Sequence, residues 1–509
     1  MAENNPLTLL LHPDDDILVA LSDLPAGTEL EAYGLACRED IPAGHKVARR
    51  DLAAGRAVRK YGQIIGATSQ GVAAGAHVHS HNLHFEQFAR DLAIGSETKP
   101  TAYVAPEEQA TFQGYLRADG RAATRNYLGV LATVNCSASV CRFIADAVGP
   151  ELLAQYPGVD GVVALGHGTG CGQSAASVGF NYLQRCLAGY ARHPNFAGVL
   201  LVGLGCEVNQ LSSLMENMSL SEGPLLRTMN IQEAGGTAKT VQWGVEIIKE
   251  MLPQAGQARR QALPASHLVL GLECGGSDAY SGLTANPALG AAVDLLVSHG
   301  GTAILSETPE IYGAEHLLTR RAISQEVGDK LAQRIKWWEQ YTARQGANLD
   351  VNPSPGNKAG GLTTILEKSL GAVAKGGTGN LVEVYEYAQP VSAKGMVFMD
   401  TPGYDMVSIT GMVAGGANLV CFTTGRGTVC GSKPTPSLKL ATNSAMYGRM
   451  AEDMDINCGP IADGEATVED MGRAIFELIL ITASGRPTKS EALGFGDNEF
   501  VPWQVGATL

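Results

Sequence analysis

Short runs of apolar residues, each ending at a glycine-rich polar turn, recur along the chain beyond residue 112. The runs lie at 126–136, 161–172, 198–210, 267–278, 301–310, 395–405 and 418–428. Continuous apolar runs of this length are typical of parallel strands buried on both faces. Helical patterns lie between several of them, as at 137–156 and 315–341. The pattern predicts α/β architecture with largely parallel sheets, in which ligands bind beyond the carboxyl ends of the strands.

The first 95 residues follow a different pattern, a short repeat without helical periodicity. Four segments begin with an apolar residue, continue through two small or turn-forming residues to glycine, and then return to apolar residues. They start at Leu24, Ile41, Leu52 and Val72, and their glycines are Gly27, Gly44, Gly55 and Gly75. Because glycine tolerates positive φ, each repeat predicts a turn between short strands. We therefore expect a small all-β domain over residues 1–95.

Two polar segments without periodicity divide the rest of the chain. Residues 96–112 are polar and interrupted by prolines, which is typical of a linker. Residues 251–266 carry two prolines and a basic pair, and they indicate a second boundary. The sequence thus predicts a smaller α/β domain over 113–255 and a larger one over 265–509.

A histidine-rich stretch falls on the last repeat of the β domain. Residues 75–84 hold His77, His79, His81 and His84, out of eleven histidines in 509 residues. Side chains two apart in a strand share a face, about 6.5 Å apart along the chain, so the first three would project together. Such imidazoles suit Fe²⁺, Mn²⁺ or Zn²⁺. A polar, solvated strand is the alternative, and the density of histidines favours metal or substrate contact.

Three of the predicted strands end in motifs that pair cysteine with glycine and an ionisable neighbour. Thiolate, imidazole and carboxylate groups bind metals or move protons, and glycines let the backbone approach a ligand. Tight packing of small residues is the alternative for any one motif, but three similar motifs favour a catalytic function. The residues concerned are His167 with Cys171, Cys206 with Glu207, and Glu273 with Cys274 and Asp278.

Two loops supply cationic groups. Residues 352–361 contain two prolines and offer Asn357, Lys358 and glycine amides, a composition that suits an anion. Residues 422–428 present Arg426 between glycines, and a guanidinium matches a carboxylate. Either loop could instead be structural, with its cation paired internally. Neither has the spacing of a P-loop.

Composition narrows the classes of partner and compartment. With 45% hydrophobic and 17% charged residues the chain is typical of ordered globular proteins, and its formal net charge of −14 argues against nucleic acid or an anionic membrane as partner. The start of the chain lacks the pattern of a secretory signal, and no apolar run approaches the roughly 18 residues of a membrane span. We therefore expect a cytoplasmic protein whose ten dispersed cysteines are thiols or ligands. A small anionic substrate remains compatible, in a locally positive pocket.

Taken together, these motifs resemble the altronate and galactarate dehydratase family of sugar-acid hydro-lyases over nearly the whole chain. The resemblance implies an amino-terminal SAF-type β domain, two family-specific domains, dependence on Fe²⁺ or sometimes Mn²⁺, and a 2-keto-3-deoxy sugar acid as product. The matching stretches are 117–126, GHGTGCG (166–172), GLGCE (203–207), 273–287, 352–361, 422–428 and MDIN (454–457).

Within that family the branches share most motifs. The histidine cluster and ECGGSD resemble the altronate branch, whereas residues 151–163 and MDINCG (454–459) are more similar to the galactarate branch. D-altronate is the predicted substrate, and D-galactarate is the alternative.

The mechanism expected from the resemblance removes a C2 proton beside a carboxylate and a hydroxyl from C3, with a metal stabilising the enediolate. His77 and His79, and less strongly His81, are the predicted metal residues. Proton transfer is assigned to His167, Glu207 and Asp278, with Cys171, Cys206 and Cys274 as ligands or wall residues of the site. The predicted substrate-binding residues are Arg125, Asn126, Asn357, Lys358 and Arg426.

Two other functions stay open at this stage, as does a homo-oligomeric state. Cys171, Cys206 and Cys274 could instead hold a [4Fe–4S] cluster with one iron open to substrate, although their spacing has no C-x₂-C signature. The chain could also bind a sugar acid without turning it over.

Overall fold

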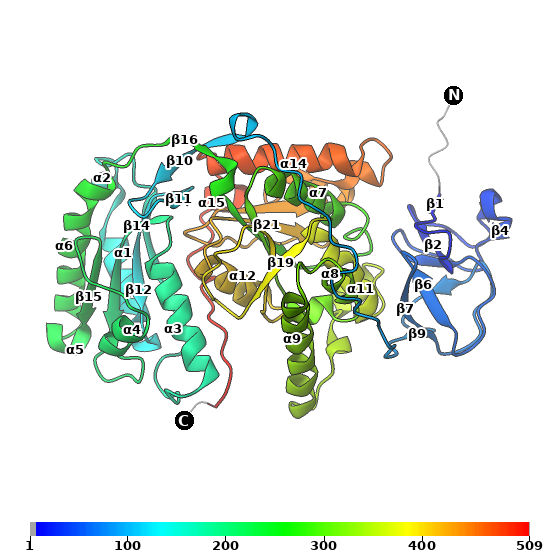
Figure 1. Ribbon diagram of the computed structural model, residues 1–509, viewed down its shortest axis with the longest axis horizontal. Coiled ribbons are helices and arrows are strands. Elements are labelled where there is room, and N and C mark those ends of the chain that lie inside the picture. Colours follow the sequence, from blue (N-terminus) through cyan, green and yellow to red (C-terminus); the bar gives the residue numbers. More distant parts are fainter. Residues whose placement is uncertain (1–6, 508–509) are drawn as a thin grey trace.

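A computed structural model, which describes residues 7–507, shows three domains whose order in space differs from their order in the chain (Figure 1). The C-terminal domain lies in the centre. The amino-terminal β domain lies on its right in the view, and the second domain lies on its left. The two domains that are neighbours in the sequence are therefore separated by the third.

The amino-terminal domain is built from short antiparallel strands. One sheet has the order β1-β2-β5-β8, a second has the order β6-β7-β9, and β3 pairs with β4. The four repeat glycines all have positive φ, between 73° and 84°, which confirms the predicted turns. The repeats also pair with one another, through the bridges Leu24 with Ile41 and Leu52 with Val72. The strands are β1 (Thr8–Leu9), β2 (Ile17–Ala20), β3 (Glu29–Leu30), β4 (Leu35–Ala36), β5 (Lys46–Ala48), β6 (Ala57–Lys60), β7 (Gln63–Thr68), β8 (His77–Val78) and β9 (Leu83–His84).

The segment that leaves this domain runs along the C-terminal domain. The Lys99 N–H donates to Asn380 Oδ1 at 3.0 Å, and the Val104 N–H donates to the Ser298 carbonyl at 2.9 Å. Strand β10 (Thr111–Leu116) begins at the end of the expected linker and pairs antiparallel with β11 (Ala122–Ala123) and β16 (Gln261–Pro264). The two polar segments of the sequence thus meet in one small sheet between the α/β domains.

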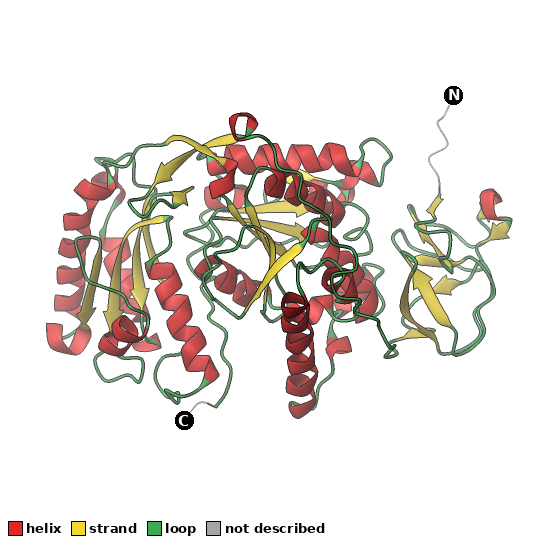
Figure 2. Cartoon of the chain, viewed as in Figure 1, coloured by secondary structure: helices red, strands yellow, loops and turns green. Residues whose placement is uncertain are grey.

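The second domain is a parallel sheet of order β13-β12-β14-β15 with helices on both faces (Figure 2). Alternate residues of β12 explain the two covered faces: Leu128 and Val130 pack with α1 and α6, whereas Leu131 packs with α3. Its strands are β12 (Tyr127–Ala132), β13 (Gly161–Leu165), β14 (Phe196–Gly203) and β15 (Leu226–Asn230). Its helices are α1 (Asn135–Ala147), α2 (Pro150–Leu153), α3 (Val178–Ala191), α4 (Leu211–Asn217), α5 (Ile231–Ala234) and α6 (Thr237–Ala255).

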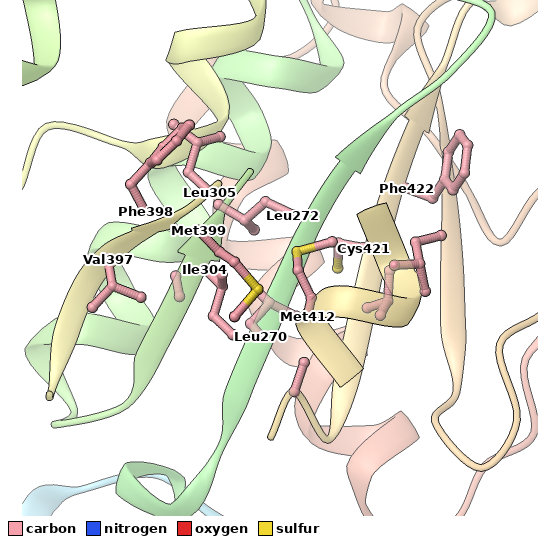
Figure 3. Close-up of a cluster of buried hydrophobic side chains, with 14 of the residues drawn as sticks. Leu270, Leu272, Ile304, Leu305, Val397, Phe398, Met399, Met412, Cys421 and Phe422 are labelled. Carbon is pink, nitrogen blue, oxygen red and sulfur yellow. The ribbon is translucent and has the colours of Figure 1, made fainter. Parts of the chain in front are cut away.

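The C-terminal domain holds a seven-stranded parallel sheet of order β19-β20-β18-β17-β21-β22-β23. Its core includes Leu270 and Leu272 of β17, Ile304 of β18, Val397 of β20 and Met412 of α12, all fully buried (Figure 3). The predicted α/β architecture with largely parallel sheets is thus confirmed. The strands are β17 (Val269–Cys274), β18 (Thr302–Leu305), β19 (Leu381–Tyr385), β20 (Gly395–Met399), β21 (Leu419–Thr424), β22 (Ser437–Ala441) and β23 (Ile456–Asn457). The helices are α7 (Ala285–Ser298), α8 (His316–Thr319), α9 (Gln325–Arg344), α10 (Pro355–Ala359), α11 (Ile365–Val373), α12 (Asp405–Ala414), α13 (Ser444–Arg449), α14 (Val468–Ala483) and α15 (Lys489–Ala492).

Close backbone approach joins the two α/β domains. A Cβ at Gly189 of α3 would lie 2.3 Å from the Ala414 carbonyl oxygen of α12, so glycine is required where these helices meet. No helix among residues 7–507 combines the length and the apolar character needed to cross a bilayer.

Candidate active site

Three histidines of the β domain form a cluster of possible metal ligands. His45 directly precedes β5, and β5 pairs with β8 so that Val47 lies opposite His77. His45 Nδ1 lies 3.0 Å from His77 Nε2, and the His77 and His79 rings stack with centroids 5.4 Å apart. One ligand nitrogen from each of His45, His77 and His79 lies within 4.8 Å of the others. The sequence had indicated the latter two; His45 is added by the structure.

The expected continuous strand through this stretch is wrong beyond Val78. Strand β8 ends there, and the Asn82 and Leu83 N–H groups both donate to the His79 carbonyl in a turn. The turn leaves His79 beside His77 but leaves His81 exposed, with its ring 5.4 Å from the His77 ring. His81 is therefore outside the three-histidine group.

The protonation of the cluster favours metal binding. Burial, reinforced by neighbouring histidines and Lys46, lowers the pKa of His77 to about 4 and that of His79 to about 3. Both imidazoles are therefore neutral near pH 7, which is the form that binds metals. His79 Nδ1 is buried and has no hydrogen-bond partner among residues 7–507, so this nitrogen is available to a ligand. This donor set fits a divalent ion such as Fe²⁺ or Mn²⁺.

The loop that carries His45 packs against two loops of the C-terminal domain. A Cβ at Gly44 would lie 3.2 Å from Ala279 and 3.7 Å from the Gly360 carbonyl oxygen. Tyr280 donates its hydroxyl to the Leu21 carbonyl at 3.1 Å. The histidine cluster therefore lies at an interface between the β domain and the strand-end loops of the C-terminal domain, where α/β proteins commonly bind ligands.

A buried ion-pair network crosses the same interface. Lys46 Nζ and Lys60 Nζ lie 3.0 and 2.8 Å from Glu367 carboxylate oxygens, and all three side chains are essentially inaccessible. Thr363 also donates to Glu367, through its hydroxyl at 2.6 Å. Burial lowers the pKa of Lys46 to about 8, with the Lys60 charge acting in the same direction and Glu367 opposing it. The network therefore fixes the β domain against the C-terminal domain directly beside His45.

Asp278, one of the predicted proton-transfer groups, is buried beside this interface. It accepts hydrogen bonds from the Ser281 N–H at 2.9 Å, from Thr442 Oγ1 at 3.0 Å and from Asn443 Nδ2 at 3.1 Å. Burial raises its pKa, while these donors oppose the shift. Asp278 is also 3.0 Å from the position a Cβ would take at Gly360, so it lies against the loop of residues 352–361.

The predicted cation loops lie on either side of Asp278. The Arg426 N–H donates to the Gly276 carbonyl at 2.8 Å and the Arg426 side chain is exposed, whereas Lys358 is half-buried. Asn357 is engaged in folding: its Nδ2 donates to the Ser277 carbonyl at 2.8 Å, and its Oδ1 accepts from Ser354 in a capping box. Lys358 and Arg426 are therefore available to an anionic ligand, and Asn357 instead fixes the loop.

A second cluster of ionisable groups lies deeper, at the carboxyl ends of β17 and β18. Cys274 Sγ is 3.5 Å from Glu307 Oε2 and 3.6 Å from Glu310 Oε2. Lys375 and Lys368 pair with these glutamates at 2.8 and 2.7 Å. Burial, and then Glu307, raises the pKa of Cys274 well above its usual value. Cys274 is thus a protonated, enclosed thiol, and the carboxylates around it had no distinguishing motif in the sequence.

Four of the other predicted catalytic residues lie in the second domain. His167 Nε2 lies 3.0 Å from the Ala132 carbonyl, and burial lowers its pKa to about 4. Glu207 accepts from Thr133 Oγ1, the Leu204 N–H and the Gly205 N–H, so it holds together the loops after β12 and β14. Cys171 and Cys206 are exposed.

Arg125 and Asn126, predicted to bind substrate, are enclosed within the fold. Arg125 forms a two-pronged pair with Glu491, at 2.7 and 2.8 Å, and its remaining nitrogen donates to the Thr124 and Thr482 carbonyls. Asn126 Nδ2 donates to the Gly158 and Ala255 carbonyls. Their side chains are committed to interactions between segments of the protein, and we place neither in the candidate site.

The predicted residues therefore divide into two groups. His77, His79, Asp278, Lys358 and Arg426 gather where the β domain meets the C-terminal domain, whereas the second-domain residues lie on the other side of the molecule (Figure 1). A single site built from all three domains of one chain, as the sequence suggested, is not what the structure shows.

Comparison with known proteins agrees with this three-domain organisation. Residues 6–86 match an altronate/galactarate dehydratase SAF domain, and residues 114–256 match the second domain of D-galactarate dehydratase/altronate hydrolase. Residues 265–508 match the C-terminal domain of D-galactarate/altronate dehydratase. The chain belongs to the altronate/galactarate dehydratase family.

Several known proteins align with this chain over most of its length. Altronate dehydratase of Bacillus subtilis (strain 168) is 35% identical over 503 residues, covering 98% of this chain and 99% of that protein. Galactarate dehydratase (L-threo-forming) of Escherichia coli (strain K12) is 37% identical over 484 residues, covering 94% of this chain and 92% of that protein. The beta subunit of (2R)-sulfolactate sulfo-lyase of Chromohalobacter salexigens is 30% identical over 394 residues, covering 77% of this chain and 96% of that subunit.

Membership of the altronate/galactarate dehydratase family settles the class of reaction. The dehydratases named above are hydro-lyases, so this chain is a carbon–oxygen lyase, as its motifs had predicted. The SAF-type β domain and the two α/β domains expected from the resemblance are likewise confirmed.

Proposed function

We propose that this enzyme dehydrates a sugar acid, D-altronate in the first instance, to a 2-keto-3-deoxy sugar acid at the interface of the β domain and the C-terminal domain. The observation that carries the proposal is the cluster of His45, His77 and His79, in which two neutral imidazoles lie beside the loops of Asp278 and Lys358. Candidate metal ligands thus lie beside charged side chains that suit an anionic, hydroxylated substrate.

The names of the relatives support a shared part of the substrate. Altronate, galactarate and sulfolactate are each 2-hydroxycarboxylates with a group at C3 that can leave. Residues common to such enzymes would therefore recognise the carboxylate and the 2-hydroxyl. The half-buried Lys358 and the exposed Arg426 are suited to the carboxylate, since both carry a positive charge.

D-altronate is preferred because the relatives that act on altronate align with this chain from end to end. The altronate dehydratases of B. subtilis and E. coli each cover 98% of this chain and 99% of their own length. The histidine cluster favours the same substrate, since it resembles the altronate branch. D-galactarate is the second candidate, because the galactarate dehydratase has the higher identity, 37%.

His45, His77 and His79 would hold the Fe²⁺ or Mn²⁺ of the proposed reaction. When bound, such an ion withdraws electron density from the substrate, which makes the C2 proton more acidic and stabilises the enediolate. The enclosed position of His45 and the half-burial of the other two keep part of the surrounding water away. The low dielectric that results strengthens every charge interaction there.

One of the chain's own groups is placed to handle the leaving hydroxyl, whereas Lys46 is enclosed in its pair with Glu367 and fixes the interface beside it. Asp278, whose pKa burial raises, can hold a proton for the departing C3 hydroxyl. The enol product then becomes the ketone, and no oxidant or reductant is needed.

The proposed substrate is tested by a screen of the full chain loaded with Fe²⁺. Purified enzyme is incubated with D-altronate, D-galactarate and other aldonic and aldaric acids, and the 2-keto-3-deoxy product is measured. The proposal expects the highest kcat/KM with D-altronate. Turnover of D-galactarate without turnover of D-altronate would replace the assigned substrate, and binding of these acids by calorimetry without any turnover would contradict the catalytic proposal.

A further inference from the structure

Three exposed cysteines lie at one edge of the second domain. Of the ten cysteines, six are buried and Cys430 is half-buried, whereas Cys136, Cys171 and Cys206 are exposed. Free cysteine is among the most buried residue types, so exposed thiols need an explanation. Cys136 follows β12, Cys171 follows β13 and Cys206 follows β14. These are adjacent parallel strands, and their carboxyl ends lie at the same edge of the sheet.

Hydrogen bonds between the three loops hold their backbones together. The Asn135 N–H, one residue before Cys136, donates to the Thr169 carbonyl at 2.9 Å. The Asn209 N–H donates to the carbonyl of Gly170, one residue before Cys171, at 3.1 Å, and Asn209 Nδ2 donates to the Thr133 carbonyl at 3.0 Å. Each loop is thus bonded to another within a few residues of its cysteine.

Glycines permit this close approach. Gly170 has φ +99°, and a Cβ there would lie 2.5 Å from the Thr133 carbonyl oxygen. Gly205 has φ +122°, and a Cβ there would lie 2.7 Å from Gln232 Oε1. Both glycines directly precede a cysteine of the set. The glycines of the GTGCG and GLGCE motifs therefore allow Cys171 and Cys206 to lie at the same edge of the second-domain sheet.

The surroundings of the thiols suit anionic sulfur. Gln232 Nε2 donates to Cys206 Sγ at 3.3 Å, and hydrogen bonds of this kind tune the sulfur ligands of clusters. Cys136 lies in the first turn of α1, a helix of 13 residues, whose amino-terminal end carries partial positive charge. Cys206 thus has a hydrogen-bond donor directed at its sulfur, and Cys136 lies at the amino-terminal end of a helix.

Among residues 7–507, the cysteine sulfurs do not form a compact site for a single tetrahedral ion. A tetrahedral ion with bonds of about 2.3 Å would hold thiolates about 3.8 Å apart. No group of three cysteine sulfurs lies within 4.8 Å of one another in the part of the chain that the structure describes. A cubane cluster binds each thiolate through a different iron and therefore spaces them more widely. Because the ligands come from three separate loops, no C-x₂-C spacing is expected in the sequence.

We propose that Cys136, Cys171 and Cys206 bind a [4Fe–4S] cluster whose fourth iron has no ligand from the cysteines. The set replaces Cys274 of the sequence-based alternative, because Cys274 is a buried thiol between Glu307 and Glu310 in the C-terminal domain. The cluster site is separate from the histidine site proposed above. The three cysteines would hold such a cluster at the carboxyl edge of a parallel sheet, where α/β proteins commonly bind ligands.

The proposal is tested by anaerobic reconstitution of the full chain with Fe²⁺ and sulfide. We expect about four acid-labile sulfide per chain, about four iron beyond the ion assigned to the histidine site, and a broad visible absorption that dithionite bleaches. The sulfide, these four iron and the absorption should be lost in Cys136→Ser, Cys171→Ser and Cys206→Ser. Cys430→Ser is the matched control, since Cys430 is the remaining cysteine with partial exposure, and it should keep the cluster. Iron without sulfide, or a cluster retained in the three variants, would overturn the proposal.

A second measurement does not depend on folding of the variants. In the reconstituted wild-type chain, Cys136, Cys171 and Cys206 should be protected from alkylation together, and removal of iron with a chelator should expose them together. Alkylation of all three at equal rates before and after reconstitution would contradict cluster binding. His77→Ala should leave this protection intact, so failure of the histidine proposal and failure of this one are distinguishable.

Discussion

Replacing Glu367 by glutamine is expected to destabilise the protein by about 3–5 kcal/mol, because it leaves two buried lysines without their counter-charge. Lys46 and Lys60 both pair with this carboxylate, and none of the three side chains is more than 1% exposed. The variant should lower the denaturant midpoint of the transition that separates the β domain from the C-terminal domain. Hydrogen exchange resolves that transition from unfolding of the second domain.

A matched control removes a carboxylate that contributes little. Glu326 pairs with Lys330 on α9 with 78% of its side chain exposed, so Glu326→Gln should cost less than about 1 kcal/mol.

The stabilisation that Glu367 provides also has a defined pH dependence. The two lysines hold the pKa of Glu367 far below its ordinary value of 4.5, so its contribution is fully present above that value and is lost as the pH falls below it. Equal effects of the two substitutions would contradict this account of the interface.

The second large effect is expected from the histidine cluster. If the proposed metal site is right, His77→Ala and His79→Ala should each lower the metal content and reduce kcat for the sugar acid by about 100-fold or more, because each removes one of the three histidines proposed to bind the metal. His81→Ala is the control, since His81 is exposed and outside that group, and it should keep metal and turnover. Metal content by elemental analysis and turnover are measured on the same preparations.

Acid should release the metal only at low pH. The pKa of His77 is about 4 and that of His79 about 3, so both imidazoles stay neutral well below the ordinary value of 6.5. We expect the metal to be retained as the pH falls from 7 and to be released as it approaches about 4. Release of the metal near pH 6.5, where ordinary histidines become protonated, would contradict this prediction. Full activity in both alanine variants would show that the reaction does not use this cluster.

Apolar runs were sufficient to predict most of the two parallel sheets. Each of the seven runs overlaps a strand, because a strand covered by helices on both faces must be apolar throughout. The strands without a prediction are at or near sheet edges and are more polar or shorter: β15 (LRTMN), β19 (LVEVY), β22 (SLKLA) and β23. At those positions side chains are partly exposed or bonded to neighbouring loops, so hydrophobicity alone carries less information.

His45 shows which part of the site a sequence can and cannot reveal. It lies after the glycine turn of the second repeat, much as His77 follows the turn of the fourth, and the strands that follow these turns pair with each other. A comparison of the second and fourth repeats in the sequence would therefore have identified His45 as a candidate. By contrast, the cysteine motifs of 166–172 and 273–278 look alike in composition, yet one ends in an exposed loop of the second domain and the other in a sealed cluster. Which sheet edge faces which domain depends on tertiary packing that local motifs do not encode.

The central position of the C-terminal domain has a consequence for synthesis of the chain. Lys46 and Glu367 are 321 residues apart in sequence, and the β domain docks on loops that are translated long after it. Until residue 367 has left the ribosome, Lys46 and Lys60 stay in water with their charges solvated. The interface that bears His45, His77 and His79 is therefore completed only after residue 367 has been synthesised, so a nascent chain cannot assemble the proposed catalytic interface before that point.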